Sequence, residues 1–271
     1  MPPPLLDYRN VTVYRGDRVA LDNINLSVAR GEHVAILGPN GSGKSTLIKT
    51  FTRECYPAPG DGESWLRIMG QDTWDVTSLR SMLGIVTNDL VTACTSGMSS
   101  DFVDNPRRVT GRNTVLSGFF SSIGVWPHHH VTAEMQRKTD EILDRFDVGH
   151  LADRPLREVS SGEARRIVIG RALVHDPAAL VLDEVANSLD LGASRELRDI
   201  VRRIAQAGTT VVMVTHHLPE IIPEINRVIL LRQGRIVADG PKAGLLTADR
   251  LSSLFGVPVE VTERDGYFDA R

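Results

Sequence analysis

The feature that most constrains the fold is a short apolar run that ends in a glycine-rich segment. In His33–Leu37 four consecutive apolar residues follow the histidine, which is typical of a fully buried parallel strand. Three glycines lie within the next six residues, Gly38–Gly43, and helix-forming residues occupy Lys44–Lys49. A strand, a glycine loop and a helix in this order predict the start of an α/β unit.

The glycine-rich segment fits the pattern G-x-x-x-x-G-K-[ST], the phosphate-binding loop. Glycines let backbone N–H groups converge on phosphate oxygens, and the following helix points its positive end at them. We expect Lys44 to reach the β- and γ-phosphates and Ser45 to ligate Mg²⁺. The alternative is a glycine turn that only joins strand to helix, but the buried strand and the helix are the context that the motif requires. The predicted nucleotide contacts are Gly38, Pro39, Asn40, Gly41, Ser42, Gly43, Lys44, Ser45 and Thr46.

A second apolar strand, Leu180–Leu182, ends in two carboxylates, Asp183 and Glu184. Two charges at a buried strand end are costly unless a cation is bound there. Asp183 is suited to holding Mg²⁺ together with Ser45, and Glu184 is suited to polarising an attacking water. Solvated acids at an exposed strand end are the alternative, which the phosphate loop upstream disfavours.

A helix predicted over 161–175 begins with a possible second anion site. The Ser160 hydroxyl and the free N–H groups of the first turn could bind an anion. Ser160 and Glu163 also fit an ordinary capping box, in which each side chain accepts from the backbone N–H of the other residue. The two interpretations are compatible.

The remaining pattern predicts an α/β core with an insertion. We expect strands over 8–37, at 84–88, 179–183 and 210–215, and around Gly234 and Gly266. Helices are expected at 113–122, 132–147, 192–207, near 218–222 and at 248–255. Residues 89–112 are rich in Ser, Thr, Asp, Asn and Gly and predict a long surface loop.

Composition excludes several classes of protein. The chain is 41% hydrophobic and 24% charged, which is ordinary for a globular protein and argues against a disordered or fibrous one. A net charge of −3 argues against a surface that binds nucleic acid, and two cysteines exclude a disulfide scaffold. No apolar run approaches the roughly 20 residues that span a bilayer, and the N-terminus lacks the features of a signal peptide. We therefore expect a cytoplasmic protein whose membrane contacts come through a partner.

The ordered set of motifs resembles the ATP-binding subunit of ABC (ATP-binding cassette) transporters, over about residues 5–240. Gly38–Ser45 is similar to the Walker A motif, and Leu180–Glu184 is similar to Walker B. Ser160–Glu163 resembles the ABC signature. Ser188–Asp190 resembles the D-loop, and His216 resembles the switch histidine of this family.

The resemblance implies an α/β P-loop NTPase fold of ABC type, with a mixed sheet core, an antiparallel β part and a helical subdomain. The helical subdomain would occupy about 89–175 inside an ATPase domain at 5–240, and residues 241–271 would form a C-terminal extension packed on the core.

The resemblance also implies roles for individual residues in ATP hydrolysis. Tyr14 matches the aromatic residue that stacks on adenine, although it could instead pack on its strand neighbours. The implied catalytic residues are Glu184, His216 and Lys44, and the implied Mg²⁺ ligands are Ser45, Asn88 and Asp183. Further nucleotide contacts would come from Tyr14, Asn88, Ser160, Ser161, Gly162, Glu163 and Asp190.

The chain departs from the family pattern at several positions. Asn88 stands where glutamine is usual and is one methylene shorter, so we expect it to reach Mg²⁺ only through water. Ser161 and Glu163 replace the usual glycine and glutamine of the signature. Val185 and His217 replace a proline and an acid. The run His128–His130 is expected to be a solvated loop rather than a metal site.

The resemblance implies a dimer, because the signature of one subunit in this family closes over the ATP of the other. The chain has one Walker A motif and one signature, so two copies would meet head to tail around two ATP molecules. The segments Thr114–Phe120 and Leu251–Val259 resemble importer ATPases of the metal-chelate and molybdenum type. The implied function is ATP hydrolysis that powers import of a metal chelate or oxyanion through a separate membrane permease, with this subunit at the inner face of the membrane.

Two other functions are compatible with some of the motifs. A soluble ABC ATPase could act on nucleic acid, on ribosomes or in regulation, but such proteins usually carry two cassettes or a long coiled coil. A regulatory module could bind nucleotide without hydrolysing it, and the presence of both Glu184 and His216 argues against that.

Overall fold

The computed structural model describes residues 2–59, 63–96 and 109–271. The chain forms two compact units. The first unit contains Met1–Leu79 and Val201–Arg271, and the second contains Arg80–Ile200. Two helices, α2 (Val76–Met82) and α8 (Leu191–Gln206), run across the boundaries between these segments.

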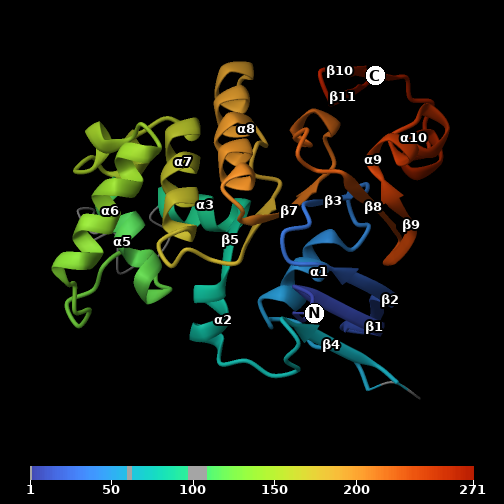
Figure 1. The fold of residues 1–271 in the computed structure, drawn as a ribbon, viewed down its shortest axis with the longest axis horizontal. Helices are drawn as coiled ribbons and strands as arrows, with labels where there is room; N and C mark the ends of the chain where they lie inside the picture. The colour runs from blue at the N-terminus through green and yellow to red at the C-terminus, as the bar shows by residue number, and fades with distance from the viewer. Residues whose placement is uncertain (1, 60–62, 97–108) are drawn as a thin grey trace. The chain divides into compact units, whose positions relative to one another are not determined.

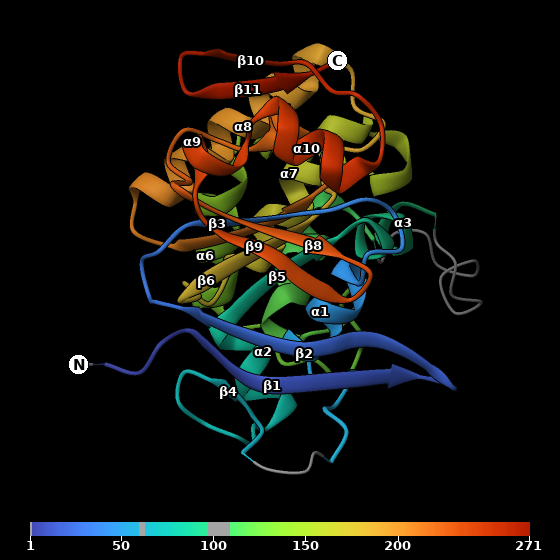
Figure 2. The ribbon, with the colours of Figure 1, turned by 90° about the vertical axis from the view of Figure 1, so that its right-hand side faces the viewer.

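The first unit contains a three-stranded antiparallel sheet in the order β2-β1-β4 (Figure 2). The strands are β1 (Leu6–Arg15), β2 (Arg18–Val28) and β4 (Trp65–Ile68). Alternate side chains of β1, including Leu6 and Tyr8, are buried, as expected for a sheet with one face on the core.

The first unit also contains a mixed sheet around β3 (Val34–Leu37). Every residue of β3 is buried, and the strand lies parallel to both β7 (Thr210–Thr215) and β8 (Arg227–Arg232). An antiparallel strand, β9 (Arg235–Pro241), pairs with the outer side of β8. The helix α1 (Lys44–Phe51) follows β3 after the glycine loop. The predicted mixed sheet with a separate antiparallel part is confirmed.

The C-terminal part of the first unit is tied to the segment after β7. The elements here are η5 (Leu218–Glu220), α9 (Lys242–Leu245), α10 (Ala248–Phe255), β10 (Val261–Arg264) and β11 (Tyr267–Ala270). The Lys242 ammonium donates to the carbonyls of Ile222, Pro223 and Gly266, at 3.2–3.3 Å. The predicted helix at 248–255 has the bounds of α10.

The second unit consists of a parallel strand pair and a group of helices. The strands β5 (Leu83–Thr87) and β6 (Ala179–Asp183) are hydrogen-bonded neighbours. Three helices, α5, α6 and α7, pack against one another (Figure 1). Among its described residues, the non-strand elements that lie wholly in this unit are α3 (Asn88–Ser96), α5 (Gly111–Leu116), η2 (Ser117–Phe120), α6 (Ala133–Arg145), η3 (Gly149–Leu151), η4 (Leu156–Glu158) and α7 (Ser161–Ala172).

The prediction of a surface loop over 89–112 is wrong at both ends of that range. Residues 97–108 lie outside the described residues. The helix α3 begins at Asn88, which was expected to end the preceding strand, and α5 begins at Gly111. The Thr87 hydroxyl accepts the Leu90 N–H at 3.1 Å and so caps α3, while Val91 and Cys94 are buried three residues apart. The polar composition that favoured a loop is also typical of a capped first turn.

Within the described ranges, none of the helices has the length and apolar character needed to cross a membrane.

Candidate nucleotide-binding site

The phosphate loop joins β3 to α1 in the first unit and depends on glycine. Gly43 has φ 108°, and a Cβ there would lie 2.8 Å from the carbonyl oxygen of Ala20. At Gly38 a Cβ would lie only 2.2 Å from the Leu231 carbonyl oxygen. The N-cap of α1 is Gly43, which has no side chain to cap the helix, and the first turn of α1 contains no acidic residue. The backbone N–H groups of this turn are therefore suited to an anion.

The side chains of the loop fit a phosphate group. Lys44 is 5% exposed, and its ammonium donates to the carbonyls of Gly38 at 2.8 Å and Pro39 at 3.2 Å. The buried Ser42 hydroxyl has no hydrogen-bond partner among the residues that the structure describes. A buried polar group without a partner is costly, and a phosphate oxygen would remove that cost. On the first turn of α1, Ser45 is exposed and Thr46 is buried.

The strand pairing in the first unit brings His216 to the phosphate loop. Leu37 and Thr215 are register partners on the parallel strands β3 and β7. The residues that follow them, Gly38 and His216, therefore leave the sheet at the same edge. His216 is half-buried, and its ring centroid lies 3.9 Å from that of the exposed His217.

Tyr14 lies near the end of β1, where it is the register partner of Val19. The residue is 54% exposed, so packing on strand neighbours leaves much of the ring accessible. This exposure favours the interpretation of Tyr14 as a stacking surface over that of a core tyrosine.

The second unit brings the carboxylates of β6 together with Asn88. Thr87 and Asp183 are register partners on β5 and β6, so Asn88 and Glu184 both follow the paired strand ends. Asn88 is exposed, while Asp183 and Glu184 are half-buried. Of the three predicted Mg²⁺ ligands, Asn88 and Asp183 belong to this unit and Ser45 belongs to the first. Their hydroxyl, amide and carboxylate oxygens are the hard ligands that Mg²⁺ prefers. In the described part of the chain, no group of three or more His, Cys, Asp or Glu side chains could hold a metal ion by itself.

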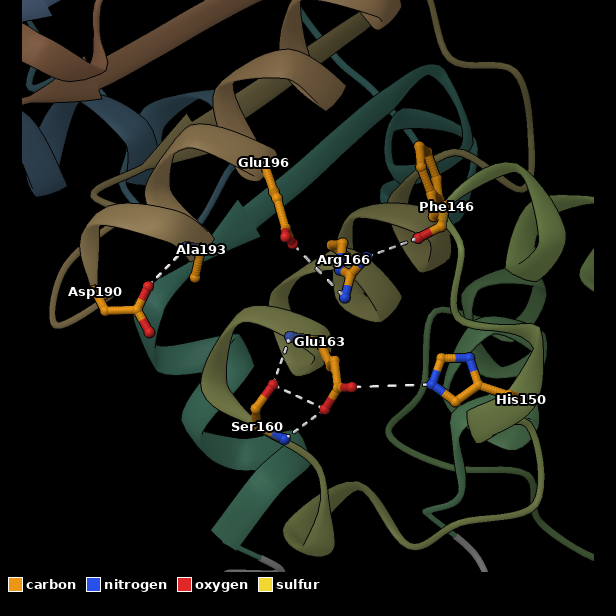
Figure 3. Close-up of polar contacts among 8 residues, drawn as sticks. All are labelled: Phe146, His150, Ser160, Glu163, Arg166, Asp190, Ala193 and Glu196. Atoms are coloured by element: carbon orange, nitrogen blue, oxygen red, sulfur yellow. Dashed lines mark hydrogen bonds and ion pairs between the residues drawn. The ribbon is translucent and has the colours of Figure 1, made fainter.

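The predicted signature turn forms a complete capping box at the start of α7 (Figure 3). The Ser160 Oγ accepts the Glu163 N–H at 3.3 Å, and Glu163 Oε2 accepts from both the N–H and the hydroxyl of Ser160 at 2.8 Å. These hydrogen bonds to Ser160 are the main cause that lowers the pKa of Glu163. The Nε2 of His150 lies 3.9 Å from Glu163 Oε1. The capping interpretation is confirmed, and Ser160 remains exposed.

Asp190, the predicted D-loop residue, caps α8 beside the predicted signature turn. Its Oδ1 accepts the Ala193 N–H at 2.8 Å (Figure 3). A Cβ at Gly162 would lie 2.9 Å from the Cβ of Ala193. The signature turn therefore contacts the first turn of α8 directly, and glycine is the residue that permits this approach.

Sequence reasoning missed two residues that contact the predicted motifs. Arg165 is only 5% exposed and donates to the carbonyls of Ser161 and Asn187. The side-chain amide of Asn187 donates to Glu184 Oε2 at 3.0 Å. Arg165 lies on the face of α7 that also carries the buried Val168 and Ile169. A charged residue on an apolar helix face is a signal in the sequence, because a buried charge implies specific partners.

The histidine run before α6 has a structural role at its middle residue. His129 Nδ1 accepts the Trp126 N–H at 3.1 Å, and its ring stacks on Phe120 with centroids 4.1 Å apart. His129 is half-buried, while His128 and His130 are exposed.

A phosphate loop between a parallel strand and a helix, with acids at the end of another parallel strand, defines a P-loop nucleotide-binding protein. The model of the ABC transporter family matches residues 21–187. The chain belongs to the ABC transporter family. It is the ATP-binding and ATP-hydrolysing component, as the motifs predicted.

Similarity to individual proteins extends over almost the whole chain. The hemin import ATP-binding protein HmuV of Bradyrhizobium diazoefficiens is 30% identical over 270 residues, which cover 97% of this chain and 92% of that protein. The phosphonates import ATP-binding protein PhnC 2 of Oceanobacillus iheyensis is 31% identical over 248 residues, 90% of this chain and 92% of that protein. An ATP-binding cassette of an ABC transporter in its ADP conformation has the same fold. Its TM-score is 0.76 at 24% identity, with 93% of this chain and 98% of that chain covered.

Proposed function

We propose that this chain hydrolyses ATP to power the import of a metal chelate or an oxyanion through a separate membrane permease. The observation that carries the proposal is the similarity over 97% of the chain to a hemin import protein. Hemin is a metal chelate, and the phosphonate of the second relative is an oxyanion. This subunit would then work at the inner face of the membrane, bound there through the permease.

Each motif has a chemical role in this proposal. Lys44 and the backbone of residues 38–46 bind the phosphates, and Tyr14 stacks on the adenine. Glu184 polarises the attacking water, while His216 contacts the γ-phosphate. Ser45, Asn88 and Asp183 would hold Mg²⁺, with Asn88 acting through water. When bound, the ion neutralises charge on the phosphate oxygens.

The proposed assembly contains two copies of the chain. The signature residues Ser160–Glu163 and the D-loop Asp190 of one copy contact the ATP that the other copy holds. Binding of two ATP molecules closes the dimer, and hydrolysis opens it. The helical subdomain at about 89–175, within the ATPase domain 5–240, docks the permease beside Asn88, and residues 241–271 form an extension of the core.

The catalytic part is tested with Glu184→Gln. We expect this variant to bind MgATP with unchanged affinity and to hydrolyse it about 10²–10⁴-fold more slowly, because an amide cannot polarise water as a carboxylate does. Glu141→Gln is the matched control, since Glu141 is exposed on α6, where it pairs with Arg137. Near-normal steady-state hydrolysis by a folded Glu184→Gln protein would contradict the role of Glu184.

The transport part is tested in native membranes. Affinity purification of the chain is expected to recover an integral membrane permease, and uptake of radiolabelled hemin or phosphonate should be lost with Glu184→Gln. Recovery of ribosomes or nucleic acid instead of a permease would favour a soluble ABC ATPase.

A further inference from the structure

The carboxylate of Glu184 is held by a side chain that follows it in a tight turn. Asn187 donates its side-chain amide to Glu184 Oε2 at 3.0 Å and its backbone N–H to the Glu184 carbonyl at 3.2 Å. Glu184 and Ser188 both have left-handed backbone conformations, with φ of 51° and 63°. The turn therefore folds back on the carboxylate and restricts the rotation of its side chain.

The same turn is attached to the signature turn through Arg165. This buried side chain donates one Nη to the Ser161 carbonyl at 3.3 Å and the other Nη to the Asn187 carbonyl. A guanidinium stays charged, and its hydrogen bonds are stronger than those between neutral groups. Ser161 belongs to the signature and Asn187 to the loop after Glu184, so one side chain joins the two motifs.

A second, independent contact joins the signature turn to the start of α8, a few residues after Asn187. Gly162 of the signature packs on Ala193, whose N–H is capped by Asp190 of the D-loop. Figure 3 shows Asp190 and Ala193 beside the signature turn that carries Ser160 and Glu163. Displacement of the signature turn must therefore act on both ends of the segment from Asn187 to Ala193.

We propose that Asn187 and Arg165 are positioning residues for ATP hydrolysis, which hold Glu184 and couple its carboxylate to the signature turn of the same chain. This inference rests on the proposed function, in which Glu184 polarises water and the signature contacts the partner's ATP. Binding of ATP at the signature of one copy then sets the orientation of that copy's own Glu184. A misplacement of about 1 Å can lower a rate by roughly 10²-fold, so such a coupling is kinetically significant.

The role of Asn187 is tested by comparing Asn187→Asp with Asn187→Ala. Aspartate has nearly the shape of asparagine but presents an acceptor to Glu184 in place of a donor. We expect kcat to fall about 10-fold or more in Asn187→Asp and less in Asn187→Ala, with KM for MgATP within about twofold of wild type in both. A packing role predicts the reverse order, because alanine removes more volume. That order, or an unchanged kcat, would overturn the proposal.

The role of Arg165 is tested with Arg165→Met and Arg165→Lys. Methionine removes the charge, and lysine keeps it but cannot bridge two carbonyls as the planar guanidinium does. We expect kcat to fall about fivefold or more with KM unchanged in each variant that melts cooperatively. Arg137→Met is the control, since Arg137 is exposed on α6. If Arg165→Met fails to fold, Arg165→Lys carries the test.

The coupling between Arg165 and Asn187 is tested with the double variant Arg165→Lys/Asn187→Asp. If Arg165 acts through Asn187, the double variant should be no more than about twofold slower than the slower single variant. If the fold-reductions in kcat of the two single variants multiply in the double variant, the proposed coupling is overturned. Glu184→Gln is measured alongside: if it retains activity, the proposed role of Glu184 fails. If it loses activity while Asn187→Asp does not, only this inference fails.

Discussion

At the scale of single residues, Lys44 gives the sharpest test of the phosphate loop. Its ammonium is held inside the loop by the carbonyls of Gly38 and Pro39, where a phosphate oxygen would be a stronger, charged acceptor. Lys44→Ala should therefore lower MgATP affinity about 10- to 150-fold, since a hydrogen bond to a charged group contributes about 1.5–3 kcal/mol. Isothermal titration calorimetry measures the affinity. Lys49→Ala, on the same helix, is the control, and equal affinity of Lys44→Ala and wild type would refute the assignment.

The phosphate loop was predictable from the sequence, whereas the roles of Arg165 and Asn187 were not, because a local pattern defines the loop and tertiary packing defines the contacts of Arg165. The phosphate loop was predictable because its pattern specifies the backbone, and the structure shows that Gly38 and Gly43 each lack room for a Cβ. Arg165 and Asn187 were not predictable in this way. Arg165 binds the Asn187 carbonyl, which only the packing of α7 against the loop after β6 brings within reach.

At the scale of elements, α1 is fixed to the antiparallel sheet by a buried hydrogen bond. The Tyr8 hydroxyl of β1 lies 2.7 Å from Thr50 Oγ1, and Thr50 itself donates to the Leu47 carbonyl. Both side chains are buried, and burial raises the pKa of Tyr8 well above its usual value, so the hydroxyl stays protonated and donates. The helix that carries Lys44 is therefore anchored to β1 by a buried polar contact.

Removal of that contact should destabilise the first unit without altering its chemistry. Tyr8→Phe keeps the edge-to-face packing on Phe51 but leaves the Thr50 oxygen without its donor. We expect a loss of about 0.5–1.5 kcal/mol in the free energy of unfolding and a fall of a few degrees in Tm. Thermal melting followed by circular dichroism measures this, and the KM for MgATP should stay within about twofold. Tyr56→Phe, at an exposed tyrosine, is the control. A Tm equal to that of wild type would show that the bond contributes nothing.

Most elements were predictable because long apolar periodicity and helix caps are local signals. The helix α10 and the strands β6 and β7 lie where the pattern placed them. The helix α3 was missed because it carries only two buried residues, Val91 and Cys94, in a polar segment. Its cap at Thr87 belongs to the preceding strand, and composition alone does not reveal such a cap.

At the scale of the whole molecule, one chain supplies a single phosphate loop and a single signature turn. The proposed dimer uses the exposed Ser160 of one copy against the ATP of the other. The capping box at Ser160 has a purely structural explanation, so a test must separate loss of a helix cap from loss of a dimer contact.

Ser160→Arg in a Glu184→Gln background separates loss of the helix cap from loss of the dimer contact. The Glu184→Gln protein should accumulate as an ATP-bound dimer, detectable by light scattering. Addition of Ser160→Arg should return it to the monomer, because an arginine side chain fills the space between the copies. ATP binding to the single chain should persist. Loss of the cap alone would cost about 0.5–2 kcal/mol of stability and would leave association unchanged.

Two control variants accompany this dimerisation experiment. Ser160→Thr keeps a capping hydroxyl and should still dimerise. Thr132→Ala removes the cap of α6, where the Thr132 Oγ1 accepts the Met135 N–H at 3.2 Å, so it should lower Tm by a similar amount without affecting the dimer. Dimer fraction is measured against ATP concentration for all variants. If the Ser160→Arg protein dimerises with ATP as well as its Glu184→Gln parent does, Ser160 does not act on the partner's nucleotide. The signature turn would then be only the cap of α7.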